Sequence, residues 1–198
     1  MYVFRPMVMV MAFVLSESVL GVSAQADRES GRSSLSGVTV DAEVRKEVAR
    51  EYAGATIVEH ADVDIKTCGT RAEHPGWIKA DFNEDGRPDH AVLLMTRQPE
   101  KGPARVTVHV VVLLGDKNKG YRHIIFDRVE EAVPIIKYIG KQPPGTIHES
   151  EAVAAEQGEG RSVTLQNPGW MFISCQQYAR VYYWDARSSR FEEIPTVD

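Results

Sequence analysis

One segment constrains the fold of this chain more than any other, because apolar residues recur at every second position from Arg105 to Leu114. Side chains of a β-strand alternate between the two faces of a sheet, so this period predicts a strand. One face carries Val106, Val108, Val110, Val112 and Leu114, and the other carries Thr107, His109, Val111 and Leu113. Since both faces hold apolar residues, we expect this strand in the interior of a sheet.

Strand character recurs along the chain in short segments bounded by Gly, Pro, Asn or Ser. These segments are residues 76–80, 90–95, 121–129, 133–139, 162–166, 170–175, 180–184 and 191–194. The turn-forming residues 115–120 predict a hairpin between the strand at 105–114 and the one at 121–129. Residues 141–160 contain Pro, Gly and Glu without a clear period, which predicts a long surface loop.

A helical period occurs near the start of the folded part. It begins after Asp41, a suitable N-cap, reaches Tyr52 and ends before Gly54. The recurring apolar positions are Ala42, Val44, Val48 and Ala49. Many short strands and one helix predict an α+β fold, which is a mainly antiparallel β-sheet with one N-terminal helix packed on it.

The N-terminal residues have the pattern of a secretory signal peptide. Arg5 precedes an apolar run from Met7 to Leu15, and the small residues Ala24-Gln25-Ala26 form a cleavage site. Ser16-Glu17-Ser18 interrupts the apolar segment, which leaves it too short to span a bilayer, although an uncleaved anchor is the alternative. The expected organisation is a signal peptide over 1–26, a disordered leader over 27–37 and a single mainly-β domain over 38–198. We therefore expect a periplasmic or secreted protein with no membrane insertion after cleavage.

The chain has two cysteines, Cys68 and Cys175. Export places them in an oxidising compartment, where a pair of thiols can form a disulfide. The bridge would close a loop of about a hundred residues, for which chain-entropy estimates give roughly 4–5 kcal/mol of stabilisation. The alternative is two free, buried thiols.

Every second position from Asp81 to Asp89 can offer an oxygen ligand around Gly86, from a side chain at four positions and from the main chain at Arg87. Ca²⁺ takes roughly six to eight oxygen ligands, and a short loop supplies them by curling round the ion. Gly86 allows the sharp turn that this curl needs. The predicted ligands are the side chains of Asp81, Asn83, Asp85 and Asp89 and the main-chain carbonyl of Arg87. The other interpretation is a polar hairpin turn, where Asn, Asp and Gly are common without any metal.

The loop does not complete an EF-hand, because Val92 stands at the twelfth position, where that motif needs a bidentate Glu. With a strand on each side and Asp89 at the ninth position, residues 76–95 resemble the FG-GAP or VCBS calcium-loop repeats. Glu84 stands where those repeats usually have glycine. The resemblance implies a calcium site, and the single copy of the motif argues against a full propeller. Tyr182-Tyr183-Trp184-Asp185 before a hairpin also looks like a group of small exported bacterial proteins, which implies a fold but no reaction.

Catalytic patterns are weak in this sequence. The histidines show no zinc-binding spacing, although His109 and His123 could meet across the predicted hairpin. We expect His90 to point away from the metal loop, because neighbours in a strand face opposite sides. Glu130-Glu131, Glu149 with Glu151, and Glu192-Glu193 are adjacent carboxylates that we read as solvated faces. Trp77, Trp170 and Trp184 could form a sugar-stacking platform, but core aromatics are commoner.

The net charge of −5 gives the chain no electrostatic reason to bind nucleic acid. The function that these patterns favour is an exported, calcium-stabilised, non-enzymatic binding or structural domain with a protein or carbohydrate ligand. The alternative is a secreted hydrolase with a structural calcium site. A concave pocket with two titratable groups of perturbed pKa would favour the hydrolase.

Overall fold

The computed structural model describes residues 39–69, 74–98, 104–118, 120–158 and 160–197. The predicted signal peptide over 1–26 and the leader over 27–37 lie outside these residues. Gly37–Asp198 forms one compact unit. Its described strands pair in antiparallel fashion, which confirms the predicted mainly antiparallel β structure.

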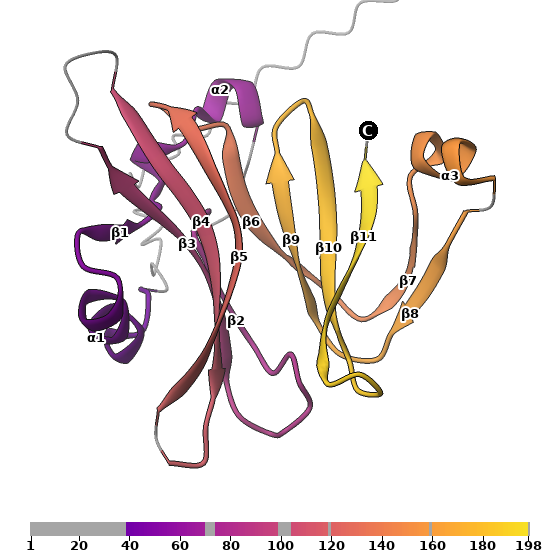
Figure 1. The fold of residues 1–198 in the computed structure, drawn as a ribbon, viewed down its shortest axis with the longest axis horizontal. Coiled ribbons are helices and arrows are strands. Elements are labelled where there is room, and N and C mark those ends of the chain that lie inside the picture. Colours follow the sequence, from indigo (N-terminus) through magenta and orange to yellow (C-terminus); the bar gives the residue numbers. More distant parts are fainter. Residues whose placement is uncertain (1–38, 70–73, 99–103, 119, 159, 198) are drawn as a thin grey trace, which may run out of the picture. The chain divides into compact units, whose positions relative to one another are not determined.

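The first sheet has five strands, with β4 in its interior as the alternating pattern predicted (Figure 1). The order is β1, β3, β4, β5, and β2 pairs with the same edge of β3 as β1 does. The strands are β1 (Ala55–Ile57), β2 (Trp77–Ala80), β3 (Asp89–Arg97), β4 (Arg105–Gly115) and β5 (Tyr121–Ala132). The β4–β5 register shifts between His109 and Val111, where a bulge interrupts the pairing.

The second sheet has four strands in the order β11, β10, β9, β6, and a separate hairpin pairs β7 with β8. Their bounds are β6 (Lys137–Gln142), β7 (Gly145–His148), β8 (Ser162–Leu165), β9 (Gly169–Ser174), β10 (Tyr178–Asp185) and β11 (Arg190–Val197). The sequence did not predict this division of the strands between two sheets. The strand expected over 133–139 begins later, at Lys137, after a cis peptide bond between Val133 and Pro134.

The main hydrophobic core joins the inner faces of the two sheets. Valines from one face of β4 pack in the same cluster as Trp170, Phe172 and Tyr182 of the second sheet. Phe126 of β5 reaches across and contacts Trp170 edge to face, with ring centroids 5.0 Å apart. Strands with alternating side chains can bury one face this way while the other remains available for a further layer.

The helix α1 (Ala42–Glu51) forms that further layer on the first sheet. Its buried Val44 and Val48 pack in a second cluster with Val111 and Leu113, which lie on the opposite face of β4 from the main core. Asp41 occupies the N-cap position, but its side chain makes no capping hydrogen bond and instead accepts one from Lys79 Nζ at 2.7 Å.

The expectation of a long loop over 141–160 is wrong. This segment contains β7 and the short helix α3 (Glu151–Gln157). Ser150 caps the start of α3 through its side chain, and Gly158 ends it with a φ of 87°. A helix of seven residues is too short to show a clear period, so only these capping residues marked it in the sequence.

The disulfide links Cys68 with Cys175, whose Cα atoms are 5.0 Å apart. Cys68 ends α2 (Ile65–Cys68), a short helix that follows the single-turn helix η1 (His60–Asp62). Asp64 caps α2 by accepting hydrogen bonds from the N–H groups of Lys66 and Thr67. Cys175 directly follows β9, so the bridge joins the early chain to the second sheet, as predicted.

Candidate functional site: the β2–β3 loop and the adjacent groove

The predicted metal loop joins β2 to β3, and its backbone turns at two residues with a left-handed φ. Gly86 has a φ of 78°, a conformation that glycine adopts without strain. Glu84 has a φ of 63°, which for residues with a Cβ atom costs roughly 1–2 kcal/mol. The resembling repeats have glycine at the position of Glu84. The loop of this chain therefore holds a residue with a Cβ atom in a left-handed conformation.

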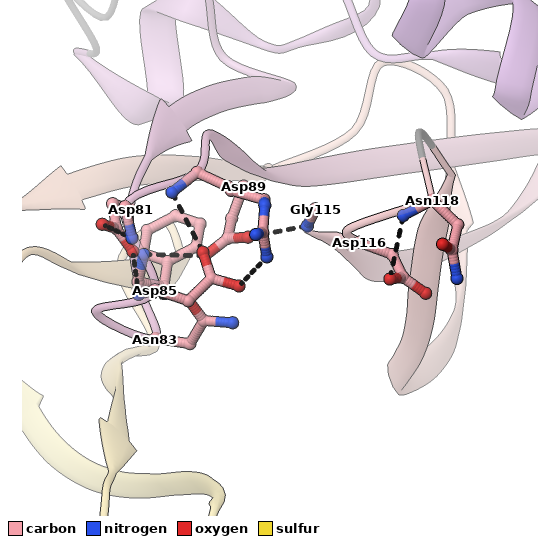
Figure 2. A network of polar contacts seen from close by, with 10 residues as sticks. Asp81, Asn83, Asp85, Asp89, Gly115, Asp116 and Asn118 are labelled. Atoms are coloured by element: carbon pink, nitrogen blue, oxygen red, sulfur yellow. Dashed lines mark hydrogen bonds and ion pairs between the residues drawn. The ribbon is translucent and has the colours of Figure 1, made fainter.

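Three side chains of the loop accept hydrogen bonds from its own backbone (Figure 2). The Asp85 N–H donates to Asp81 Oδ1 and to Asn83 Oδ1, each at 3.2 Å, so these two oxygens share one donor. The Gly86 N–H donates to Asp81 Oδ2 at 2.9 Å, and the Arg87 N–H donates to Asp85 Oδ1 at 2.9 Å. The loop thus gathers three of the four predicted side-chain ligands around one short stretch of backbone.

The fourth predicted side-chain ligand, Asp89, is completely buried at the start of β3. Its Oδ2 accepts from the Phe82 N–H and its Oδ1 from the Gly115 N–H, both at 2.8 Å. Burial raises the pKa of this carboxyl to about 6, against the opposing effect of these backbone donors. Asp89 therefore fastens the loop to the end of β4. No sequence pattern marked the contact with Gly115, which is 26 positions away.

The donor chemistry of this loop fits a hard cation such as Ca²⁺, since all its expected ligand atoms are oxygens. A carboxylate oxygen that accepts one hydrogen bond still has a second lone pair. Among the described residues, no three Asp, Glu, His or Cys side chains form a preassembled metal-binding group. Arg87 Nη1 lies 3.3 Å from Asp85 Oδ2. Asp81, Asn83, Asp85, Asp89 and the Arg87 carbonyl would hold the cation, which would replace the Arg87 guanidinium as the positive partner of Asp85.

A groove of about 650 Å³ lies beside this loop. Phe82 and Glu84 line it from the loop, and the other walls come from the turn between β8 and β9 and the turn between β10 and β11. Figure 1 shows both turns near the loop between β2 and β3. The wall residues Gln166, Asn167 and Tyr183 were not expected to belong to a site. No sequence pattern marks them, because they come from separate segments of the chain.

The three tryptophans do not form a common platform. Trp77 and Trp170 are buried in different hydrophobic clusters, which agrees with the commoner interpretation as core aromatics. Trp170 stacks on Tyr182 with ring centroids 4.1 Å apart. Trp184 is half-buried and lines the groove, while its ring also contacts Phe191.

The idea that His109 and His123 meet across the hairpin is wrong, because the register places His109 opposite Arg128 and His123 opposite Leu113. The ring of Tyr52 lies near both, with centroid distances of 5.9 and 5.7 Å. His90 lies away from the metal loop, as expected. It packs against Trp77, whose Nε1–H donates to His90 Nδ1 at 3.2 Å.

His123 connects a carboxylate to a phenol. Its Nε2 lies 2.8 Å from Glu47 Oε1, and its Nδ1 lies 3.0 Å from Tyr52 Oη. A carboxylate beside Nε2 favours a proton on that nitrogen, which leaves Nδ1 to accept from the phenol. This chain of hydrogen bonds had no recognisable spacing in the sequence, since Glu47 and His123 are 76 positions apart.

A cavity of about 380 Å³ adjoins Tyr52 and His109 at the end of α1. Burial, together with Glu51 and Glu47, raises the pKa of the Tyr52 phenol, so the phenol stays protonated at neutral pH. Burial and then Arg128 lower the pKa of His109. The cavity therefore has a proton donor, but its described lining residues include no activated nucleophile.

Four of the adjacent carboxylates take part in ion pairs, and three of these pairs lie near solvent, whereas Glu131 is largely buried with Lys137 and does not form the solvated face that was expected. The pairs are Glu130 with Arg105, Glu131 with Lys137, Glu192 with Arg190, and Glu193 with Arg180. Their geometry pairs each acid with a cation and does not direct two carboxyl groups at a common point.

Comparisons with family models, with curated proteins and with solved structures find no match to this chain. The resemblance of residues 76–95 to FG-GAP or VCBS repeats therefore stays a prediction. Within the described ranges, no helix has the length and apolar character needed to cross a membrane.

Proposed function

We propose that this chain is an exported, calcium-stabilised domain with a binding or structural role and no catalytic activity. The observation that carries the proposal is the Asp81–Asp89 loop, in which three oxygen-bearing side chains surround one stretch of backbone and a fourth ties the loop to the sheet. Like charges gathered in so short a loop repel one another, and a bound divalent cation would relieve that repulsion. Calcium would then stabilise the folded domain.

Two further features support the exported setting. The A-x-A site at Ala24-Gln25-Ala26 follows an apolar run of the kind found in signal peptides. The two cysteines form a disulfide, and disulfides persist mainly in oxidising compartments outside the cytosol. Extracellular calcium modules bind at about 10⁻⁴ to 10⁻³ M, so occupancy fits a compartment that contains calcium. We propose that the ligand of the domain is a protein or a carbohydrate.

Thermal unfolding with CaCl₂, MgCl₂ or EDTA tests the calcium role. We expect calcium alone to raise the midpoint by several degrees, because a ligand at a hundred times its dissociation constant adds about 2.7 kcal/mol. Asp85→Ala should abolish the rise. Asp116→Ala is the matched control, since Asp116 is also an acid in an exposed turn, where its Oδ1 accepts from the Asn118 N–H (Figure 2). Equal unfolding midpoints for the wild type in all three solutions would show that the loop is a polar turn without a calcium site.

A hydrolase is the second candidate, and the cavity beside Tyr52 and His109 is the observation that favours it, since it holds two groups with perturbed pKa values. We rank it lower because a phenol with a raised pKa is a poor nucleophile at neutral pH. Hydrolysis of p-nitrophenyl acetate by the wild type, lost in Tyr52→Phe, would reverse this ranking. Equal hydrolysis rates for the wild type and Tyr52→Phe would keep the binding or structural role as the preferred function.

A further inference from the structure

Glu84 combines three features that a plain turn residue does not need. It adopts a φ of 63°, where glycine would be free of strain. It lines the groove beside the loop. Its side chain is exposed and has no hydrogen bond or ion pair with any described residue. Strained residues that persist in a fold are concentrated at functional sites. A role for the Glu84 carboxylate in the groove would account for a side chain at this position.

The groove offers other polar groups that the fold itself does not use. The side chains of Gln166, Asn167 and Arg187 line it and form no hydrogen bonds within the described part of the chain. Asp185 differs from them, because its two oxygens accept from the N–H groups of Arg187 and Ser188 and so hold the β10–β11 turn. The groove thus presents a carboxylate, two amides and a guanidinium that are free to bind a ligand.

Apolar surface lies between these polar groups. Tyr183 and Trp184 are half-buried and line the groove from β10. Arg122 lies over the Trp184 ring at 5.8 Å, so the indole is held in place and contributes only part of its surface. The volume of about 650 Å³ is within the range of pockets that bind small ligands, which is about 300–1,000 Å³.

We propose that this groove binds a carbohydrate, with Glu84 as a direct contact to its hydroxyl groups. The inference rests on the binding role proposed above and names the class of ligand. Vicinal hydroxyls are both donors and acceptors, which matches a carboxylate and a guanidinium beside side-chain amides. The C–H face of a sugar ring matches the half-exposed aromatic rings. A nucleic acid fits less well, because Glu84 and Glu192 of the lining would face its phosphates.

The loop that would hold calcium also holds Glu84, so the two sites share one stretch of backbone. Glu84 lies between Asn83 and Asp85, whose side-chain oxygens accept hydrogen bonds within the loop. A cation there would fix the backbone from which Glu84 enters the groove. Binding of the carbohydrate is accordingly tighter when calcium is present, because less conformational freedom is then lost on binding.

The test begins with the fluorescently labelled protein on an array of defined oligosaccharides in CaCl₂. The most strongly bound oligosaccharide is then titrated into the wild type and variants by calorimetry. Glu84→Gln keeps the size of the side chain and should weaken binding by about ten-fold or more, because hydrogen bonds to a charged group are lost. Asn167→Ala should also weaken binding.

Glu84→Gly provides a sharper test, since folding stability and carbohydrate binding should then change in opposite directions. Relief of the left-handed strain should raise the unfolding midpoint by about 2–4 °C, while carbohydrate binding is lost. Ser189→Gly is the matched control, because Ser189 also has a left-handed φ, of 52°, but does not line the groove. It should gain stability and bind the oligosaccharide as the wild type does.

The outcomes separate this inference from the calcium proposal. An array without binding, or equal affinities for wild type, Glu84→Gln and Glu84→Gly, overturns the carbohydrate site even if calcium raises the midpoint. Binding of a protein partner at the groove with no oligosaccharide bound overturns it as well. Oligosaccharide binding that depends on Glu84 supports the site, including when Asp85→Ala shows that calcium has no role.

Discussion

At the scale of single residues, His90 makes the stability of the domain depend on pH. Burial lowers the pKa of this imidazole to about 4, and its Nδ1 accepts the Trp77 Nε1–H, which requires a neutral nitrogen. As pH falls below about 6.5, the imidazole gains a proton in the unfolded chain before it does so in the folded one. The His90 contribution to the free energy of unfolding therefore falls between pH 6.5 and 4, by at most about 3 kcal/mol. Urea unfolding across this range in EDTA measures it.

His90→Gln is the comparison for this experiment, since an amide oxygen can still accept from Trp77 without titrating. The variant is needed because Asp89, whose pKa burial raises to about 6, changes stability in the opposite direction as pH falls. We expect the wild type to lose more stability on acidification than His90→Gln does. Parallel pH profiles for the two proteins would show that His90 is not the titrating group.

At the scale of secondary-structure elements, α1 is held to the first sheet by a narrow apolar stripe. Val44 is completely buried in the cluster with Val111 and Leu113, whereas Lys46 on the same helix is exposed. Val44→Ala should lower the free energy of unfolding by about 2 kcal/mol through lost burial and a residual cavity. Lys46→Ala should change it by less than about 0.5 kcal/mol. Urea unfolding of both variants checks this, and equal midpoints would mean that α1 adds little to stability.

Elements whose residues carry a local hydrophobic pattern were predictable from the sequence. The alternation in 105–114 identified β4 and its interior place, because burial of both faces leaves a visible mark on a single strand. Prediction from the sequence failed for α3, which is too short to show a period, and for the division into two sheets, because tertiary packing decides which strands pair. The loop Asp81–Asp89 was visible as a motif. The contact between Asp89 and Gly115 and the groove were not, since they join segments distant along the chain.

At the scale of the whole folded unit, the disulfide should contribute much of the stability. The Cys68–Cys175 bridge spans 107 positions, and cross-links over loops of about a hundred residues stabilise by roughly 4–5 kcal/mol in the chain-entropy model. Replacing both cysteines by serine should lower the free energy of unfolding by up to that amount. Guanidinium unfolding of the variant, and of the wild type with and without dithiothreitol, measures the loss. A midpoint that neither change moves would show that the bridge is dispensable.

The walls of the groove come from three separate connections between strands, and these strands belong to the two packed sheets and to the separate hairpin of β7 and β8. Substitutions and length changes in such connections are tolerated far better than changes in a core. Each of these connections can therefore change in sequence or length independently of the other two, without repacking of the core between the two sheets. Descendants of one ancestral sequence could exchange one ligand for another by small steps, while the cation loop, the bridge and the buried valines stay the same.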